Sequence, residues 1–217
     1  MVILIDHGHG KNTPGKYSPK VDGTGIKGDA IEDGRFREYR YNRIIANDLC
    51  DILKSFGYDA RIVAPEENDI SLKERVRRIN KVCDKEGAGN VVMVSIHVNA
   101  HGDASEWTSA RGWTIWTTRG QNNSDKLADM IYKRAEKRFK EDGMTLRKEM
   151  SDGDPDWESD FYIIHKSKCP CCLTENFFMT NKDDVKYLLS DLGQHQIVRA
   201  HVEGILDWVS YKLGKRQ

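Results

Sequence analysis

The feature that most constrains the fold of this chain is an alternation between short apolar runs and segments of helical periodicity. Residues 2–5 form an apolar run that ends in a turn-forming stretch, and residues 91–96 form a second one. Between them, apolar side chains recur every three or four residues until Gly57, and again after Ser71, which is typical of helices that cover a sheet. We expect strands at residues 2–5, 91–96, 113–118, 161–164 and 169–174, and helices over 41–56, from Ser71, from Ser124, over 185–189 and over 197–213.

This alternation predicts an α/β fold with a single twisted, mostly parallel sheet of about five or six strands and helices on both faces. The chain has 217 residues and no Pro/Gly/Ser linker that would divide it, so we expect one domain over residues 1–217. Residues 140–160 are polar and lack core periodicity. We expect them to be an insertion that lines a cleft or forms a lid.

Charge and cysteine content exclude several classes of protein. The 34 basic residues balance 34 acidic ones, and no basic block is interleaved with aromatic residues, so we expect no nucleic-acid partner. There is no apolar stretch long enough to span a bilayer, so we expect no membrane insertion. Five cysteines do not make a disulfide framework in a chain of this size. We expect free thiols, with Cys171 and Cys172 on opposite faces of one strand.

Reactive side chains follow three of the predicted strands. His9 follows the first strand, His97 follows the strand at 91–96, and Glu175 follows the strand at 169–174. Glu38 precedes the apolar positions at 41–56, and we expect it to stand in the first turn of the helix that they form. In an open α/β sheet, ligands gather outside the carboxyl ends of the strands, so these four side chains are candidates for one shared site.

Two imidazoles and one carboxylate form a ligand set that zinc accepts in catalytic sites, with a fourth position open for water. Bound zinc lowers the pKa of its water and polarises a carbonyl, and a second carboxylate that accepts the proton completes a hydrolytic site. We assign this second role to Glu175. The residues therefore predict one catalytic zinc ion.

Four sequence motifs in this order resemble those of the zinc-dependent type-3 N-acetylmuramoyl-L-alanine amidases, a family that includes phage endolysin catalytic domains. The "DPGHGG"-like loop of that family reads "DHGHGK" here, its "EKDVNL"-like helix start reads "EYRYNR", its "SIHANA"-like strand end reads "SIHVNA", and its late "ETGFISNPED"-like element reads "ENFFMTNKDD". The likeness covers nearly the whole chain.

The resemblance implies that His9, Glu38 and His97 bind zinc and that Glu175 is the catalytic acid/base. It implies that the domain is an amidase catalytic domain, whose substrate is peptidoglycan. The bond cut would be the amide between N-acetylmuramic acid and the L-alanine of the stem peptide, and the protein would act at the bacterial cell wall.

The chain departs from the family pattern near this site. His7 replaces a proline, Lys11 replaces a glycine, and Asn176 with Phe177 replaces a Thr-Gly or Leu-Gly pair. These changes concern the shape of the substrate groove, which depends on the φ freedom of glycine. We interpret His7 as a groove residue more than a metal ligand. Asn99 is a candidate for contacting substrate, and a strand-end cap explains it equally well.

The stretch "DGDPDW" at residues 152–157 imitates the opening of a calcium-binding loop. Trp157 stands where that loop requires glycine, and Ile163 stands where it requires a bidentate glutamate. We therefore expect a solvated loop.

Two rival functions fit part of the pattern. A zinc exopeptidase would need a cation that holds a terminal carboxylate, and a non-catalytic wall-binding module would keep only the fold. We expect a monomer. The chain shows no export signal, so we expect release in the manner of a phage lysin or the earlier removal of a leader.

Overall fold

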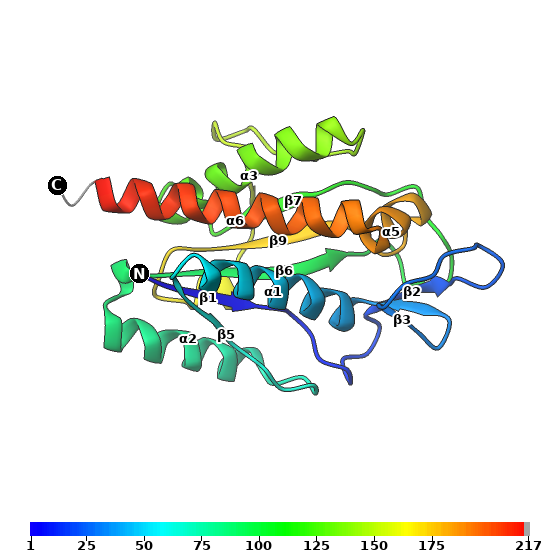
Figure 1. The fold of residues 1–217 in the computed structure, drawn as a ribbon, viewed down its shortest axis with the longest axis horizontal. Helices are drawn as coiled ribbons and strands as arrows, with labels where there is room; N and C mark the ends of the chain where they lie inside the picture. Colours follow the sequence, from blue (N-terminus) through cyan, green and yellow to red (C-terminus); the bar gives the residue numbers. More distant parts are fainter. Residues whose placement is uncertain (215–217) are drawn as a thin grey trace.

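The core of the protein is a six-stranded sheet with the strand order β5-β1-β6-β9-β7-β8. We describe a computed structural model, in which residues 1–214 are described (Figure 1). The first four strands in this order are parallel to one another, whereas β7 is antiparallel to β9 and β8 is parallel to β7. The strands are β1 (Val2–Asp6), β5 (Asp59–Ile62), β6 (Val91–Asn99), β7 (Thr114–Thr117), β8 (Trp157–Glu158) and β9 (Cys171–Phe178). The predicted mostly parallel sheet is confirmed.

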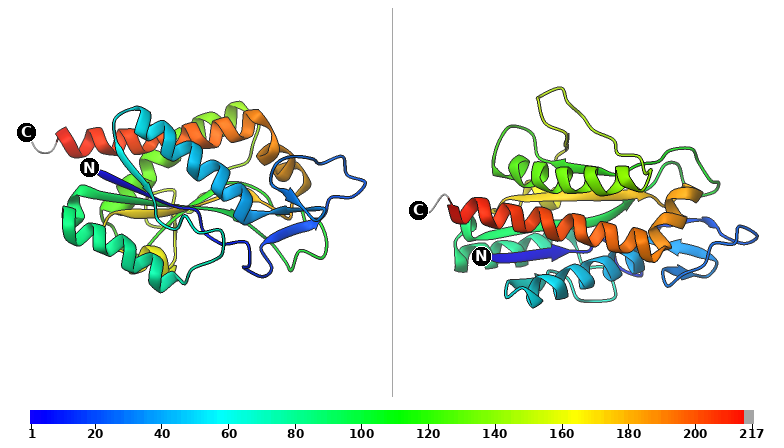
Figure 2. Two further views of the ribbon diagram at one scale, coloured as in Figure 1. Left: turned by 60° about the horizontal axis from the view of Figure 1, so that its bottom comes forward. Right: turned by 45° about the horizontal axis from the view of Figure 1, so that its top comes forward.

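Helices cover both faces of this sheet (Figure 2). One face packs against α1, α3, α5 and α6, and the opposite face packs against α2 and α4. All five side chains of β1 are buried as a result, which is why this strand reads as a continuous apolar run instead of an alternating one. The helices are α1 (Glu38–Ser55), α2 (Leu72–Glu86), α3 (Asn123–Glu141), α4 (Tyr162–His165), α5 (Lys182–Leu189) and α6 (Asp191–Gly214), with a 3-10 turn η1 (Ala88–Asn90).

The buried apolar side chains form two clusters, one on each face of the six-stranded sheet. Ile3 and Ile5 belong to the larger cluster, whereas Val2 and Leu4 belong to the smaller one. Cys172 and Cys171 divide in the same way, as the period of a strand requires. All five cysteines are free, which confirms the prediction. None of the helices within residues 1–214 has both the length and the apolar character needed to cross a membrane.

One predicted strand is wrong. Residues 161–164 were expected to form a strand, but the structure has the one-turn helix α4 there. Ile163 and Ile164 are both buried in the smaller cluster, whereas Phe161 and Tyr162 are exposed. A strand would place neighbouring side chains on opposite faces, so only a helical turn buries both isoleucines on one side.

A second, three-stranded sheet was not predicted and lies beyond one end of the main sheet (Figure 1). It consists of β2 (Tyr17–Lys20), β4 (Arg35–Arg37) and β3 (Ile31–Glu32). Its strands are short and polar, so they lack the apolar pattern by which a strand is recognised. Because β4 runs directly into α1, this sheet sets the position of the first residue of that helix, Glu38.

Candidate metal centre

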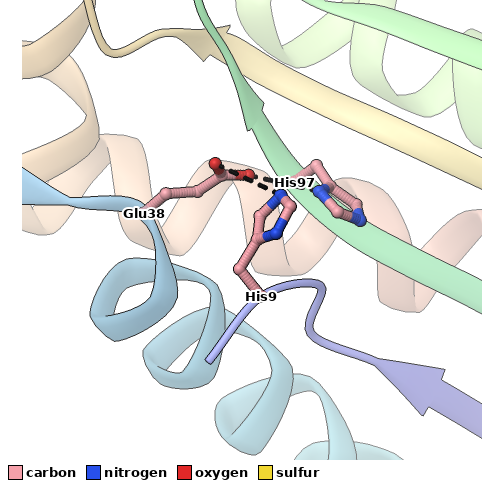
Figure 3. A group of neighbouring side chains, drawn as sticks. All are labelled: His9, Glu38 and His97. Carbon is pink, nitrogen blue, oxygen red and sulfur yellow. Dashed lines mark hydrogen bonds and ion pairs between the residues drawn. The ribbon is translucent and has the colours of Figure 1, made fainter. Parts of the chain in front are cut away.

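Three of the predicted site residues meet at the carboxyl end of the parallel strands (Figure 3). His9 lies in the loop after β1, Glu38 is the first residue of α1, and His97 lies on β6. The Glu38 carboxylate faces both imidazoles: its Oε2 lies 3.6 Å from His9 Nε2, and its Oε1 lies 3.2 Å from His97 Nδ1. One donor atom from each of the three residues lies within 4.8 Å of the other two.

The Glu38 carboxylate is buried, with 1% of its side chain exposed. Its Oε1 accepts hydrogen bonds from the Val98 amide, at 3.1 Å, and from Asn42 Nδ2, at 3.4 Å. Its Oε2 has no hydrogen-bond partner within the described residues. A buried carboxylate oxygen without a donor is costly unless a cation lies beside it.

The electrostatics of the three residues are coupled through Glu38. Burial raises the pKa of Glu38, but the hydrogen bond with His97 and the charge of His9 outweigh it and lower this pKa to about 2. Burial lowers the pKa of His9 to about 4, so its imidazole is neutral at pH 7 with a lone pair available. Burial lowers the pKa of His97 as well, but contact with Glu38 raises it above its ordinary value. His9 therefore offers a neutral imidazole, whereas contact with Glu38 favours the protonated form of His97.

Glu175, the predicted acid/base, lies beside this group. It stands opposite His97 in the register between β6 and β9, and its Oε2 is buried without a hydrogen-bond partner in the part of the chain that the structure describes. The sequence predicted that Glu175 follows a strand that ends at Thr174. The strand β9 instead extends to Phe178, so Glu175 lies within it. Burial and the charge of Glu38 raise the pKa of Glu175 to about 7.

A pocket of about 210 Å³ opens onto these residues. Leu72, the first residue of α2, is 50% exposed and lines this pocket. The pocket combines an apolar wall with one cation, Lys16, and three ionisable side chains of the candidate site. It is lined by His9, Lys16, Leu72, His97, Phe161, Tyr162, Ile163, Leu173 and Glu175.

The loop that carries His9 is held by the buried carboxylate of Asp6. Asp6 Oδ2 accepts hydrogen bonds from the Gly8 amide, at 3.0 Å, and from Ser95 Oγ on β6, at 2.8 Å. Its Oδ1 pairs with Arg75 Nη1 of α2 at 2.5 Å. Burial raises the pKa of Asp6, but Arg75 and His97 hold it below the ordinary value. Asp6 therefore ties the loop of His9 to the strand that carries His97.

Gly8 itself is required by this geometry. Its φ is +65°, and a Cβ at this position would lie 2.6 Å from Cε1 of His97. The absence of a side chain thus lets the backbone of the loop pass directly against the imidazole.

Asn176 is a positioning residue that the sequence reasoning missed. Its Nδ2 donates to the backbone carbonyl of His97 at 3.0 Å, and its Oδ1 accepts from Trp113 Nε1 at 2.8 Å. The signal in the sequence was a polar residue directly after Glu175, which had been noted only as a departure from the family pattern. Phe177, which replaces the glycine of that pattern, keeps a left-handed backbone with φ 63°. Its buried ring packs edge-on against Phe139 and Tyr187.

His7 and Asn99 lie outside the lining of this pocket within residues 1–214. His7 is 2% exposed and hydrogen bonds with the backbone of Ala64. Asn99 is the last residue of β6, and its Oδ1 accepts a hydrogen bond from the amide of Ala100 at 2.8 Å. This contact fits the interpretation of Asn99 as a cap at the end of the strand. A substrate contact by either residue stays a prediction.

Comparisons with known proteins agree on one family. A family model described as N-acetylmuramoyl-L-alanine amidase matches residues 3–207. The endolysin of Bacillus phage SPP1 is 26% identical over an alignment of 158 residues that covers 71% of this chain and 52% of that protein. N-acetylmuramoyl-L-alanine amidase AmiC of Neisseria meningitidis serogroup B is 23% identical over an alignment of 250 residues that covers 99% of this chain and 54% of that protein. The chain thus spans about half the length of both relatives.

The fold is shared with solved structures. The N-acetylmuramyl-L-alanine amidase Ami1 of Mycobacterium smegmatis superposes with a TM-score of 0.73 over 97% of each chain, at 19% sequence identity.

We predict that Asp6→Asn destabilises the metal-free protein by about 3 kcal/mol, because it leaves the buried Arg75 guanidinium without its main counter-charge. The matched control is Asp59→Asn, which removes a carboxylate from an exposed pair with Arg61 and should cost less than about 1 kcal/mol. Urea denaturation measures both. The pKa of Asp6 is lowered in the folded protein, so its ionised carboxylate contributes to the free energy of unfolding at pH values above 3.8, its ordinary pKa. The difference in this free energy between wild type and Asp6→Asn should therefore shrink as the pH falls below 3.8. Equal losses for both variants would contradict the role of Asp6.

Proposed function

Because the chain belongs to the N-acetylmuramoyl-L-alanine amidase family, we propose that it is a zinc-dependent amidase of peptidoglycan. The bond hydrolysed is the amide between N-acetylmuramic acid and the L-alanine of the stem peptide, and the protein acts at the bacterial cell wall. The observation that carries this proposal is the convergence of two imidazoles and a buried carboxylate from three separate segments, with Glu175 beside them.

The donor set fits zinc. His9, Glu38 and His97 would hold the ion, as two nitrogen donors and one oxygen donor that leave a position open. The unpartnered Oε2 of Glu38 supports this choice, since it is the atom that a cation at the centre of the group would neutralise. When bound, zinc supplies a Lewis acid that makes a water acidic and polarises the substrate carbonyl.

Glu175 is the proton carrier of the proposed reaction. A pKa near 7 means that the carboxylate can accept the proton of the attacking water and can also release it at neutral pH. The amine of L-alanine departs only when its nitrogen is protonated, so Glu175 returns the proton there. Glu175 lines the pocket, and no donor among the described residues occupies its Oε2, so the carboxylate is available for both transfers.

The pocket suits a substrate with both apolar and charged parts. Phe161 and Tyr162 expose aromatic surface, which is a frequent stacking platform for sugars. Lys16 adds a positive charge to the lining of the same pocket, where it can attract a carboxylate of a stem peptide.

Lys16 also favours one rival function. A zinc exopeptidase needs a cation beside its metal to hold a terminal carboxylate, and Lys16 lies in the same pocket as the candidate ligands. The two functions differ in the products that they release.

We predict that Glu175→Ala keeps about one zinc per chain but lowers turnover by about 10²–10⁴-fold, because the proton carrier is lost and the donors remain. His9→Ala should lose the zinc itself, because two donors remain of three. Metal analysis of the purified variants beside a turbidity assay on cell walls separates the two effects. Glu141→Ala, which removes an exposed carboxylate at the end of α3, is the control and should behave as wild type. Full activity of Glu175→Ala would refute the mechanism.

We predict that digestion of defined muropeptides releases intact stem peptides with a free L-alanine amine, together with the lactyl carboxylic acid on the sugar. Mass spectrometry of the products reports the bond directly. Release of single amino acids would favour the exopeptidase, and binding to walls without any product would favour a wall-binding module.

A further inference from the structure

A second group of acidic side chains lies apart from the candidate metal centre. Asp125 stands in the first turn of α3, and Asp154 and Asp156 come from the polar stretch at 140–160. One carboxylate oxygen from each lies within 4.8 Å of the other two. The three residues are 3%, 8% and 1% exposed, respectively. Three carboxylates are therefore gathered in a place from which water is largely excluded.

The donors around these carboxylates do not satisfy them. The hydroxyl of Thr117 lies 2.5 Å from Asp156 Oδ2 and 3.1 Å from Asp125 Oδ1, but a hydroxyl carries one hydrogen and serves one of them at a time. Gln121 Nε2 donates to Asp154 Oδ2 at 2.6 Å, and the Asn122 amide donates to Asp125. The Oδ1 atoms of Asp154 and Asp156 are buried, and among residues 1–214 no hydroxyl or N–H group donates to them. Asp154 and Asp156 can hydrogen bond to each other only while one of the two carboxyl groups holds a proton.

The negative charge of these three carboxylates is not paired with a basic side chain in the part of the chain that the structure describes. Among the ion pairs of residues 1–214, none joins Asp125, Asp154 or Asp156 to a lysine, an arginine or a histidine. Burial and the adjacent Asp154 raise the pKa of Asp156 to about 8. Without a cation, the group therefore holds a proton at neutral pH, because three buried carboxylates so close together repel one another when all are ionised.

We propose that Asp125, Asp154 and Asp156 bind a calcium ion. All donors on offer are oxygens, which hard cations prefer, whereas the imidazoles of the other group favour zinc. Two oxygens on opposite sides of calcium are about 4.6–5.2 Å apart, so donors within 4.8 Å of one another can share one such ion. Buried carboxylates that keep an oxygen without a donor, as Asp154 and Asp156 do, are groups whose charge a cation would neutralise.

The proposed site uses two aspartates of the stretch at residues 152–157, but it is not a helix-loop-helix calcium motif. The sequence analysis expected a solvated loop, because Trp157 and Ile163 stand where that motif needs glycine and glutamate. This expectation is wrong for Asp154 and Asp156, which are buried. The third carboxylate comes from Asp125, nearly thirty residues earlier in the chain, so the local spacing did not reveal it.

The ion would fasten the 140–160 stretch to the frame of the sheet. Thr117 ends β7, and the next strand in the sheet, β8, begins at Trp157, one residue after Asp156. The chain then continues into residues 161–163, which line the pocket at the candidate metal centre. Calcium would therefore hold one wall of that pocket in place without contacting the substrate.

The test uses the full chain, loaded with zinc and exchanged into buffer from which calcium has been stripped. Addition of 10 mM CaCl2, a concentration of about 10–100 times the dissociation constant typical of extracellular calcium sites, should raise Tm by about 3–10 °C. Titration calorimetry should show one calcium per chain, with release of a proton at pH 7. The absence of both the shift and the binding heat would overturn the proposal, and an equal shift with MgCl2 would overturn the choice of calcium.

Two variants and one control locate the effect. Asp156→Asn and Asp154→Asn should each abolish the calcium-dependent shift in Tm, and Asp156→Asn should be at least as stable as wild type in calcium-free buffer because it removes a buried acidic group. Asp152→Asn, in the same loop but exposed, should keep the shift. If both buried variants respond to calcium like wild type, the ion binds elsewhere and the proposal fails. These readouts do not involve hydrolysis, so they stand apart from the proposed amidase activity.

Discussion

The buried carboxylate of Asp6 is the interaction on which the candidate metal centre depends. It accepts hydrogen bonds from the loop of His9 and from Ser95 on β6, and it pairs with Arg75 of α2. These contacts join three elements across one strand end, and they do so in the interior, where a hydrogen-bonded charge pair is expensive to break. The imidazoles of His9 and His97 can therefore both face Glu38, because the loop of His9 is held against the strand β6 that carries His97.

The fold supplies the rest of the geometry through its topology. The parallel neighbours β1, β6 and β9 present their carboxyl ends at one edge, so residues far apart in sequence arrive at one place. Glu38 reaches this edge from another direction, since the small sheet delivers β4 directly into α1. The same chain assembles two groups of candidate metal ligands with contrasting chemistry. One mixes nitrogen and oxygen donors, as zinc prefers, and the other offers oxygen alone.

Much of this could be predicted from the sequence, because buried parallel strands read as apolar runs and their ends are recognisable. The order of the elements and the convergence of His9, Glu38 and His97 followed from that pattern, although their role as ligands remains a proposal. Residues 161–164 were wrongly predicted as a strand, since two adjacent isoleucines also suit one helical turn. The contacts of Asn176 and the meeting of Asp125 with Asp156 depend on tertiary packing, which no local spacing encodes.

The central claim is that His9, Glu38 and His97 surround one zinc ion with Glu175 facing it. Diffraction from zinc-loaded crystals, recorded on both sides of the zinc absorption edge, tests this claim most directly. We expect one anomalous peak at about 2.0–2.2 Å from a donor atom of each of the three residues, with the Glu175 carboxylate one water away. A peak at another place, or a Glu175 carboxylate beyond the reach of that water, would contradict it.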